Sequence, residues 1–143
     1  MLKEKDPSFL VEKLTTLLMK DGKKAKIRVL LNKVFLELTN NGHFAQLTLL
    51  LALNNVKPLV ENRKTKIRGK SFLVPFPLTM KRQLSLALRL LITASKVQKK
   101  LSIKKLANEI ILASKNEGDA VKRTAEIHLV ARQNRIYSHY RWY

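Results

Sequence analysis

The chain has no cysteine, few acidic residues and no long hydrophobic segment. The absence of cysteine excludes a disulfide scaffold and a thiolate metal site, and it is compatible with a reducing compartment. The longest largely apolar run, residues 47–53, is far shorter than the roughly 20 residues that a membrane-spanning helix requires. We therefore expect a soluble protein with no membrane partner.

The charge is strongly one-sided. The sequence has 29 Lys and Arg residues against 10 Asp and Glu residues, a formal net charge of +19 and a pI near 10.5. Such a surface attracts polyanions, and nucleic acid is the leading partner. The 143 residues match one ordinary domain, and 45% hydrophobic residues are enough to fill a single core. We expect one domain over residues 1–143, without internal repeats.

Hydrophobic periodicity predicts a mainly α fold, a six-helix domain with a projecting β-hairpin between helices three and four. The hairpin arm is expected at about residues 59–78. The expected helices run from Pro7 toward Gly22, over 27–38, 44–56, 79–97 and 102–115, and from 118 toward the C-terminus, with Asp6 and Ser102 as N-caps. The third helix is apolar on nearly every side, which predicts a position at the centre of the bundle.

The triplet Gly69-Lys70-Ser71 resembles the end of a Walker-type phosphate loop, but its surroundings do not. Such a loop needs a glycine five residues before the second glycine, so that several backbone N–H groups point at one phosphate, and Lys64 occupies that position. The loop must also lead into a helix, whereas the proline-containing segment 72–77 cannot start one. The sequence therefore does not predict an NTPase.

No set of residues indicates catalysis or metal binding. The chain has three histidines, no cysteine, and no carboxylate at a ligand-like spacing beside His128 or His139. The sequence offers no combination of nucleophile, base and orienting group. We expect no enzyme, with no catalytic residue, no cofactor and no metal ligand.

The expected hairpin carries a row of cations. Lys64, Lys66 and Arg68 are two residues apart, so in a strand they project from one face with about 6.6 Å between successive positions. The alternative is an ordinary solvated edge that lysines protect against aggregation. An isolated two-stranded hairpin is marginal in water, so a projecting one usually has a partner surface, and here an anionic one. We predict an RNA contact.

Two helices repeat this pattern of charge. The fourth expected helix has a polar stripe of Arg82, Ser85, Arg89, Thr93 and Lys96, and a packing stripe of Leu84, Leu88 and Leu91. The last helix has a polar row of His128, Arg132, Arg135 and His139. A solvated face is the default explanation of such stripes, but the scarcity of neighbouring acids favours a nucleic-acid contact.

The chain ends in three aromatic residues, Tyr140, Trp142 and Tyr143, interleaved with Arg141. Such rings can stack on unpaired bases while the cation meets a phosphate. A terminal aromatic can equally fold back and seal a core, because rings bury a large apolar area. We predict that Tyr140 packs inward and that Arg141 and Trp142 face the RNA.

Several blocks of the sequence together resemble the small-subunit ribosomal protein seven family. They are LMKDGKKAK, NNVKPLVE, RGKSFLVP, LALRLLITAS and LANEI, followed by NEGDAVKRTAEIHLVARQNRIYSHYRW. The resemblance implies a structural constituent of the small ribosomal subunit that binds the 3′ major domain of its rRNA and organises the head. It also implies an arm that lies beside the exit-site tRNA and a neighbouring ribosomal protein.

The resemblance carries RNA contact over to single positions. These are Lys23, Lys24, Lys64, Lys66, Arg68, Lys70, Arg82 and Arg89. Two features depart from the family pattern. Arg68 replaces the first of two glycines usual at the hairpin tip, which predicts a different turn. The basic extension usual before the first helix is reduced to MLKEK, which argues against an N-terminal RNA contact.

The sequence leaves alternatives for the cellular compartment and for the class of nucleic-acid-binding protein. Lysine supplies 20 of the 29 basic residues, and Leu, Ile and Asn are abundant, which suggests an AT-rich organellar genome. Because MLKEKDPS also lacks the features of an import segment, we expect a mitochondrially encoded protein of the matrix ribosome, with bacterial cytoplasm or plastid stroma as alternatives. A basic DNA-binding architectural protein is the alternative class, although no recognition helix or minor-groove wedge separates from the core.

Overall fold

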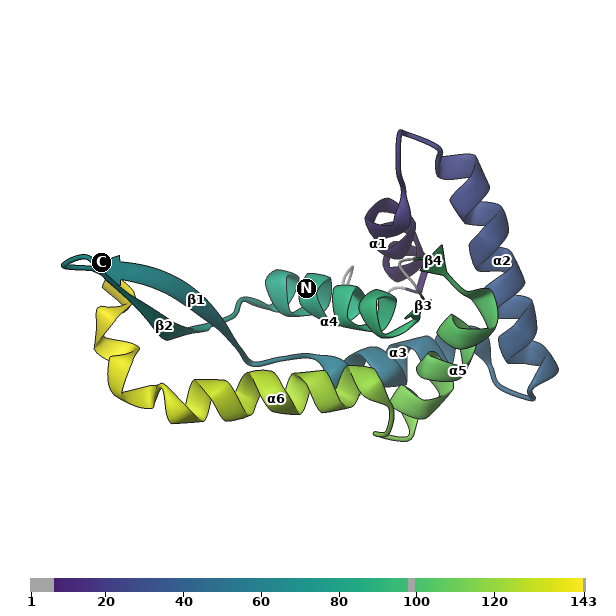
Figure 1. Ribbon diagram of the computed structural model, residues 1–143. Helices are drawn as coiled ribbons and strands as arrows, with labels where there is room; N and C mark the ends of the chain where they lie inside the picture. Colours follow the sequence, from purple (N-terminus) through teal and green to yellow (C-terminus); the bar gives the residue numbers. More distant parts are fainter. Residues whose placement is uncertain (1–6, 98–99, 143) are drawn as a thin grey trace.

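The computed structural model describes residues 7–97 and 100–142 (Figure 1). It is mainly helical, with one antiparallel hairpin between the third and fourth helices, which confirms the predicted fold class. The elements are α1 (Pro7–Leu18), α2 (Lys24–Asn40), α3 (Ala45–Val56), β1 (Val60–Ile67), β2 (Lys70–Pro77), α4 (Met80–Ala94), β3 (Lys96–Val97), β4 (Lys100–Leu101), α5 (Ile103–Ser114), α6 (Asp119–Gln133) and the 3-10 helix η2 (Arg135–Trp142). α1, α2 and α5 gather at one end, and the hairpin with η2 forms the other.

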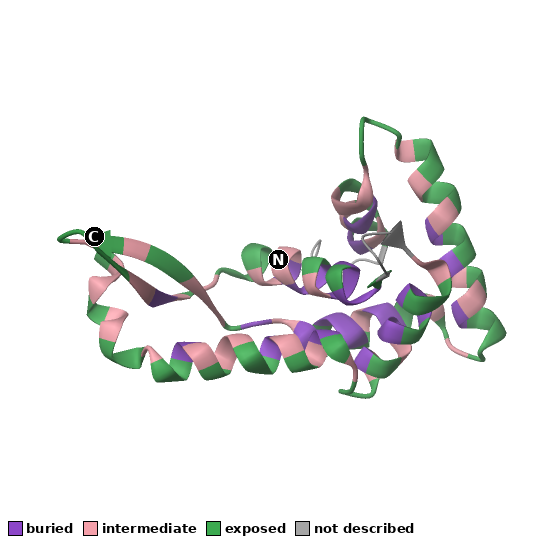
Figure 2. Cartoon of the chain, viewed as in Figure 1, coloured by how far each residue is buried: buried purple, intermediate pink, exposed green. Residues whose placement is uncertain are grey.

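Apolar faces of six helices, α1 to α6, make the core. α5 packs against both α2 and α3, and its Leu106 and Ile110 are buried together with Leu31 and Leu53 of those helices. The packing stripe predicted for α4 is buried as expected, and consists of Leu84, Leu88 and Leu91. Figure 2 shows the buried residues concentrated where α3, α4 and α5 meet, and sparse along the arm.

α3 contacts α1, α2, α4, α5 and α6, as predicted for a helix at the centre of the bundle, but these neighbours do not cover all of its apolar side chains. Leu49, Ala52 and Leu53 are buried, but Leu47 and Leu51 on the other side are 59% and 45% exposed. The neighbouring helices cover only part of α3. Apolar content identifies which side chains prefer burial, but it does not reveal how many neighbours the tertiary fold places around a helix.

The first helix is shorter than predicted. It ends at Leu18, and Asp21 and Gly22, both with positive φ, form the turn into α2. Gly22 therefore belongs to the connection and does not terminate the helix directly. The expected N-cap Asp6 lies outside the described residues, as does Tyr143.

The segment after α4 also differs from the expectation of one helix to Val97. α4 ends at Ala94, and β3 pairs with β4 in a short antiparallel ladder. Strand pairing satisfies the backbone groups there in place of a further helical turn. Ser102 does occupy the N-cap of α5, but its side chain makes no capping hydrogen bond.

α6 begins at a tight junction with α5. Gly118 has a φ of +96°, and the buried carboxylate of Glu109 accepts a hydrogen bond from the Ala120 N–H at 2.7 Å. This carboxylate satisfies a free N–H of the first turn and meets the positive end of the helix dipole. Thr124 donates to the Val56 carbonyl at 3.0 Å and joins α6 to the end of α3. These contacts fix the direction in which α6 leaves the core.

Replacing Gly118 with alanine is expected to lower the free energy of unfolding by about 3 kcal/mol. The added Cβ would lie 2.8 Å from Glu109 Oε1, and the positive φ strains any L side chain. Gly42→Ala is the matched control. Gly42 has a φ of +76° but no atom within 4 Å of an added Cβ, so we expect a loss of only about 1 kcal/mol. Denaturant unfolding measures both, and equal losses would contradict the role of Glu109.

Candidate nucleic-acid interface

The arm lies along α6 and is held there at its base (Figure 1). The Leu59 N–H, just before β1, donates to His128 Nε2 at 3.1 Å. The Asn62 side-chain amide donates to the Ile127 carbonyl at 3.0 Å. His128, which the sequence places in a polar row of the last helix, is half-buried and positions the arm.

η2 supports the other strand of the arm with aromatic rings. The ring centroid of Phe72 in β2 lies 4.9 Å from that of Tyr137 and 5.8 Å from that of Tyr140. Arg141 Nε donates to the Pro75 carbonyl at 2.8 Å. The C-terminal segment is therefore a brace for β2, which explains how a two-stranded hairpin projects from the core with a fixed direction.

The aromatic tail is divided between packing and exposure. Tyr140 packs inward against Phe72, as predicted, but the guanidinium of Arg141 is engaged by the arm. Trp142 is 92% exposed and does not seal the core. Of the two residues expected to face RNA, Trp142 is the one that the fold presents freely to solvent.

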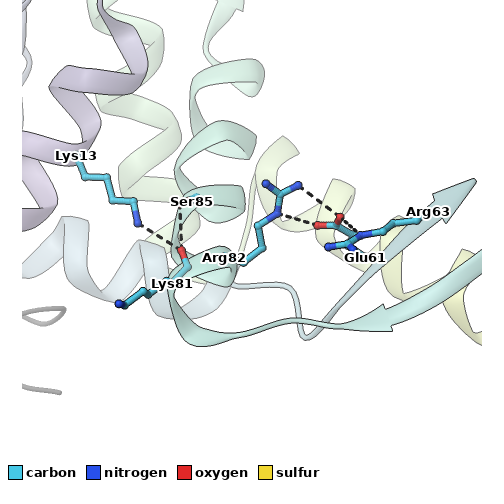
Figure 3. A network of polar contacts seen from close by, with 6 residues as sticks. All are labelled: Lys13, Glu61, Arg63, Lys81, Arg82 and Ser85. Atoms are coloured by element: carbon cyan, nitrogen blue, oxygen red, sulfur yellow. Dashed lines mark hydrogen bonds and ion pairs between the residues drawn. The ribbon is translucent and has the colours of Figure 1, made fainter. Parts of the chain in front are cut away.

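Glu61 joins the base of the arm to α4 (Figure 3). Its side chain is 15% exposed and accepts hydrogen bonds from Arg82 Nε at 3.0 Å and from Arg63 Nε at 2.6 Å. Burial raises the pKa of Glu61, but the hydrogen bonds and charges of Arg82 and Arg63 outweigh burial and lower the pKa from its ordinary value of 4.5. Arg63 also lies over the Phe76 ring, 4.9 Å from its centroid.

Sequence reasoning missed this cluster. Glu61 is the single acidic residue between positions 59 and 78, and Arg63 follows it at the spacing of one strand face. That pair was a readable signal of a local ion pair. The contribution of Arg82 was not readable, because only the fold brings the first turn of α4 beside β1. Arg82 was predicted to face RNA; its half-exposed guanidinium is hydrogen-bonded to Glu61 and holds the arm to the helix.

The row of cations on the arm is shorter than predicted. Lys64 and Lys66 are exposed on one face of β1, as expected, but Arg68 lies outside the strand. Arg68 and Gly69, with φ of +48° and +80°, form a two-residue turn whose positive φ values match the twist of a hairpin. Arg68 therefore lies at the tip of the arm and not in the row formed by Lys64 and Lys66. Lys70, the first residue of β2, is also exposed.

The polar stripe predicted for α4 is exposed except at the half-buried Ser85, and its members differ in their roles. Arg89 is exposed beyond the ion-paired first turn. The hydroxyls of Ser85 and Thr93 donate to carbonyls one turn back in the same helix, at 3.1 and 2.6 Å. Lys96 lies beyond the helix, in β3. Arg89 is thus the position on this stripe that best fits a phosphate contact.

Lys23 is the N-cap of α2 and Lys24 its first residue, at the opposite end of the molecule from the arm (Figure 1). Lys24 Nζ is 3.1 Å from Glu12 Oε1, and Lys23 Nζ is 3.6 Å from Asp21 Oδ2. These pairs are largely exposed and weak, so both lysines can exchange their carboxylates for phosphates. The fold does not gather the predicted cations in one patch but distributes them over an extended surface.

The described residues offer little for other chemistry. Lys70 and Ser71 are the first residues of a strand, so the triplet that contains them does not precede a helix. In the described part of the chain, no three His, Asp or Glu side chains are grouped as a metal site would require. None of the described helices has the length and apolar character needed to cross a membrane.

A basic helical domain that carries a braced, cationic hairpin defines a class of nucleic-acid-binding protein. Comparison with known proteins is more specific. The pattern of the family described as ribosomal protein S7p/S5e matches residues 2–135, and the chain belongs to this family.

Curated relatives agree with this assignment. The small ribosomal subunit protein uS7 of Lactobacillus delbrueckii subsp. bulgaricus is 39% identical over 137 residues, which cover 94% of this chain and 88% of the relative. The uS7 proteins of Mycobacterium sp. (strain KMS) and Oceanobacillus iheyensis are 38% and 36% identical, with the same coverage of both chains. The resemblance found in the sequence blocks is therefore confirmed at the level of the family.

Glu61→Gln is expected to lower the free energy of unfolding by about 1 kcal/mol at pH 7, since both arginine partners are about half exposed. The contribution of these ion pairs is present above the ordinary pKa of 4.5 and is lost as the pH falls through the lowered pKa of folded Glu61. Between about pH 5 and pH 3 the wild type should lose stability that the variant does not lose. Thermal unfolding across this range checks it, with Glu126→Gln, an exposed site on α6, as control. Parallel curves for wild type and Glu61→Gln would contradict it.

Tyr140→Ala is expected to lower the melting temperature of the free protein by a few degrees, which corresponds to about 2 kcal/mol for a half-buried ring. Trp142→Ala should change the free energy of unfolding by less than about 0.5 kcal/mol, because the side chain is 92% exposed. Thermal unfolding without RNA separates the two positions. The opposite order of losses would assign Trp142, and not Tyr140, to the brace.

Proposed function

We propose that this chain binds the 3′ major domain of small-subunit rRNA and organises the head of the subunit. As a member of the ribosomal protein S7 family, it is a structural constituent of the small ribosomal subunit and takes part in translation. The observation that carries the RNA contact is the braced arm. α6 and η2 support the arm, and its single acidic residue, Glu61, is already paired with arginines. The exposed cations of the arm therefore have little competition for phosphate.

The distribution of cations supports a large RNA target. Exposed basic side chains occur on the arm, on α4 and in the turn before α2, and residues 1–143 act in this proposal as one RNA-binding unit. Each phosphate contact releases counterions and adds affinity, whereas base contacts would be needed for sequence readout. Such a role requires no catalysis, cofactor or metal.

The arm and the tail suggest finer partners. The tip, with Arg68 and Lys70, would lie beside the exit-site tRNA and a neighbouring ribosomal protein. Trp142 would stack on an unpaired base, a contact worth roughly 1 to 3 kcal/mol per base. The exposure of Trp142 beside a braced strand supports this assignment.

We also propose that the particle is a mitochondrial ribosome. The support is compositional, since lysine strongly outnumbers arginine. The relatives named above are bacterial, and the alternative is therefore a bacterial cytoplasmic ribosome, with the plastid stroma as a third compartment. Locating the gene in a mitochondrial, plastid or bacterial genome would distinguish these three compartments.

Binding of the full chain to a 3′ major domain fragment, compared with duplex DNA of equal length, tests the RNA proposal against the architectural DNA-binding alternative. We expect tighter binding to RNA, with affinity falling with salt by a slope of about 0.7 to 0.9 per phosphate neutralised. Co-sedimentation with small subunits at high salt is the test inside the particle. Preference for DNA, or a nearly flat salt response, would overturn the proposal.

Changing Lys64, Lys66 and Arg68 together to Gln should reduce the salt slope of RNA binding by about 2 to 3 and weaken binding, with the melting temperature almost unchanged. A matched control removes the same charge from α5 and α6, through Lys104→Gln, Lys105→Gln and Lys122→Gln. Equal losses in both triple variants would show that only the net charge matters. If the arm variant unfolds, the row of cations contributes to folding, and its assignment as an RNA contact would be contradicted.

A further inference from the structure

One face of α3 is both apolar and uncharged. Phe44 at the N-cap, Leu47 and Leu51 follow one another at i, i+3 and i+7, and their side chains are 83%, 59% and 45% exposed. This spacing places them on one stripe, which Asn54 extends by a further turn. Single exposed leucines are ordinary, but a continuous stripe of large apolar side chains marks an interaction site.

The stripe does not fit an RNA partner. α3 contains no Lys, Arg, Asp or Glu, whereas every other helix of the described residues carries at least one basic side chain. RNA affinity depends on cations that neutralise phosphates, and leucine offers neither charge nor a hydrogen-bond donor. A second copy of this chain fits poorly as well, because two chains of net charge +19 repel one another.

We propose that this stripe docks an amphipathic helix of a neighbouring protein in the same particle, with apolar side chains flanked by Asp and Glu. Helices bind in this manner through anchors at i, i+3 and i+7. The acidic flank follows from charge complementarity. Lys57 Nζ lies 3.0 Å from Asn54 Oδ1, at the end of the stripe, and the rest of the chain is strongly basic. The proposal rests on the proposed function in so far as the particle is the small ribosomal subunit.

Single cysteines make unique attachment points in this chain, because it has no native cysteine. The full chain carrying Leu47→Cys is labelled with a benzophenone maleimide and assembled into small subunits. The subunits are then irradiated, and the cross-linked component is identified by mass spectrometry. Subunits with Lys66→Cys on the arm are treated in parallel. A cross-link from Lys66→Cys to rRNA tests the proposed function separately, so that failure of that function and failure of the docking surface are distinguishable.

We expect Leu47→Cys to cross-link to another protein, within a peptide that has apolar residues at helical spacing and carboxylates beside them. A cross-link to rRNA, to a second copy of this chain or to residues 1–6 of the same chain would overturn the proposal. The absence of any cross-link from this position would overturn it too.

A second set of variants separates docking from mere proximity. Adding Phe44→Ser and Leu51→Ser to the Leu47→Cys chain is expected to lower the cross-linking yield about tenfold, because a few apolar anchors carry most of the binding energy of such an interface. Adding Leu129→Ser, which changes a leucine of 58% exposure on α6, is the matched control and should leave the yield unchanged. Equal yields from the two chains would overturn the proposal.

Discussion

A two-stranded hairpin is marginal in water, so the arm of this protein depends on the elements that lie along it. α6 supplies the first of them, through the hydrogen bonds that tie its last turns to the start of β1. η2 supplies the second, with Tyr137 and Tyr140 against Phe72. The direction of α6 is set in turn at its first residues, where Glu109 caps the helix. The position of the arm is therefore set from the core mainly by α6, and the Glu61–Arg82 pair with α4 is a second link.

Arginine and lysine side chains differ in their roles at the base of the arm. Arg63, Arg82 and Arg141 make hydrogen bonds within the protein, to a carboxylate or to a backbone carbonyl. Lys64 and Lys66 are exposed. The planar guanidinium suits directed contacts in a partly buried site, whereas the ammonium group is a compact, hydrated charge on a flexible stem. A chain with a net charge of +19 thus holds the base of its arm with three arginines and leaves Lys64, Lys66 and, at the tip, Arg68 available for a polyanion.

The elements with strong periodicity were predictable, and their surroundings were not. α2, α5 and the hairpin appear close to their expected bounds, because apolar spacing and turn residues are local properties. The end of α4 was misplaced, since a strand pair that forms only in the folded chain interrupts it. The row of cations was predicted from a spacing of two, and that spacing fails at Arg68 because the strand has already ended in a turn. The brace by η2 left no periodic signal in the sequence.

The sequence by itself determined the class of fold, the basic charge, the absence of thiol chemistry and the family, because composition, period and block order are properties of the chain alone. The tertiary structure decided which cations are available and which are engaged. Arg82 and Arg141 read as RNA contacts in the sequence, yet each meets an acceptor more than 20 positions away in the chain. It also decided that α3 keeps an exposed apolar stripe. Pairing and burial depend on the distance between residues in space, and only the packed fold sets that distance.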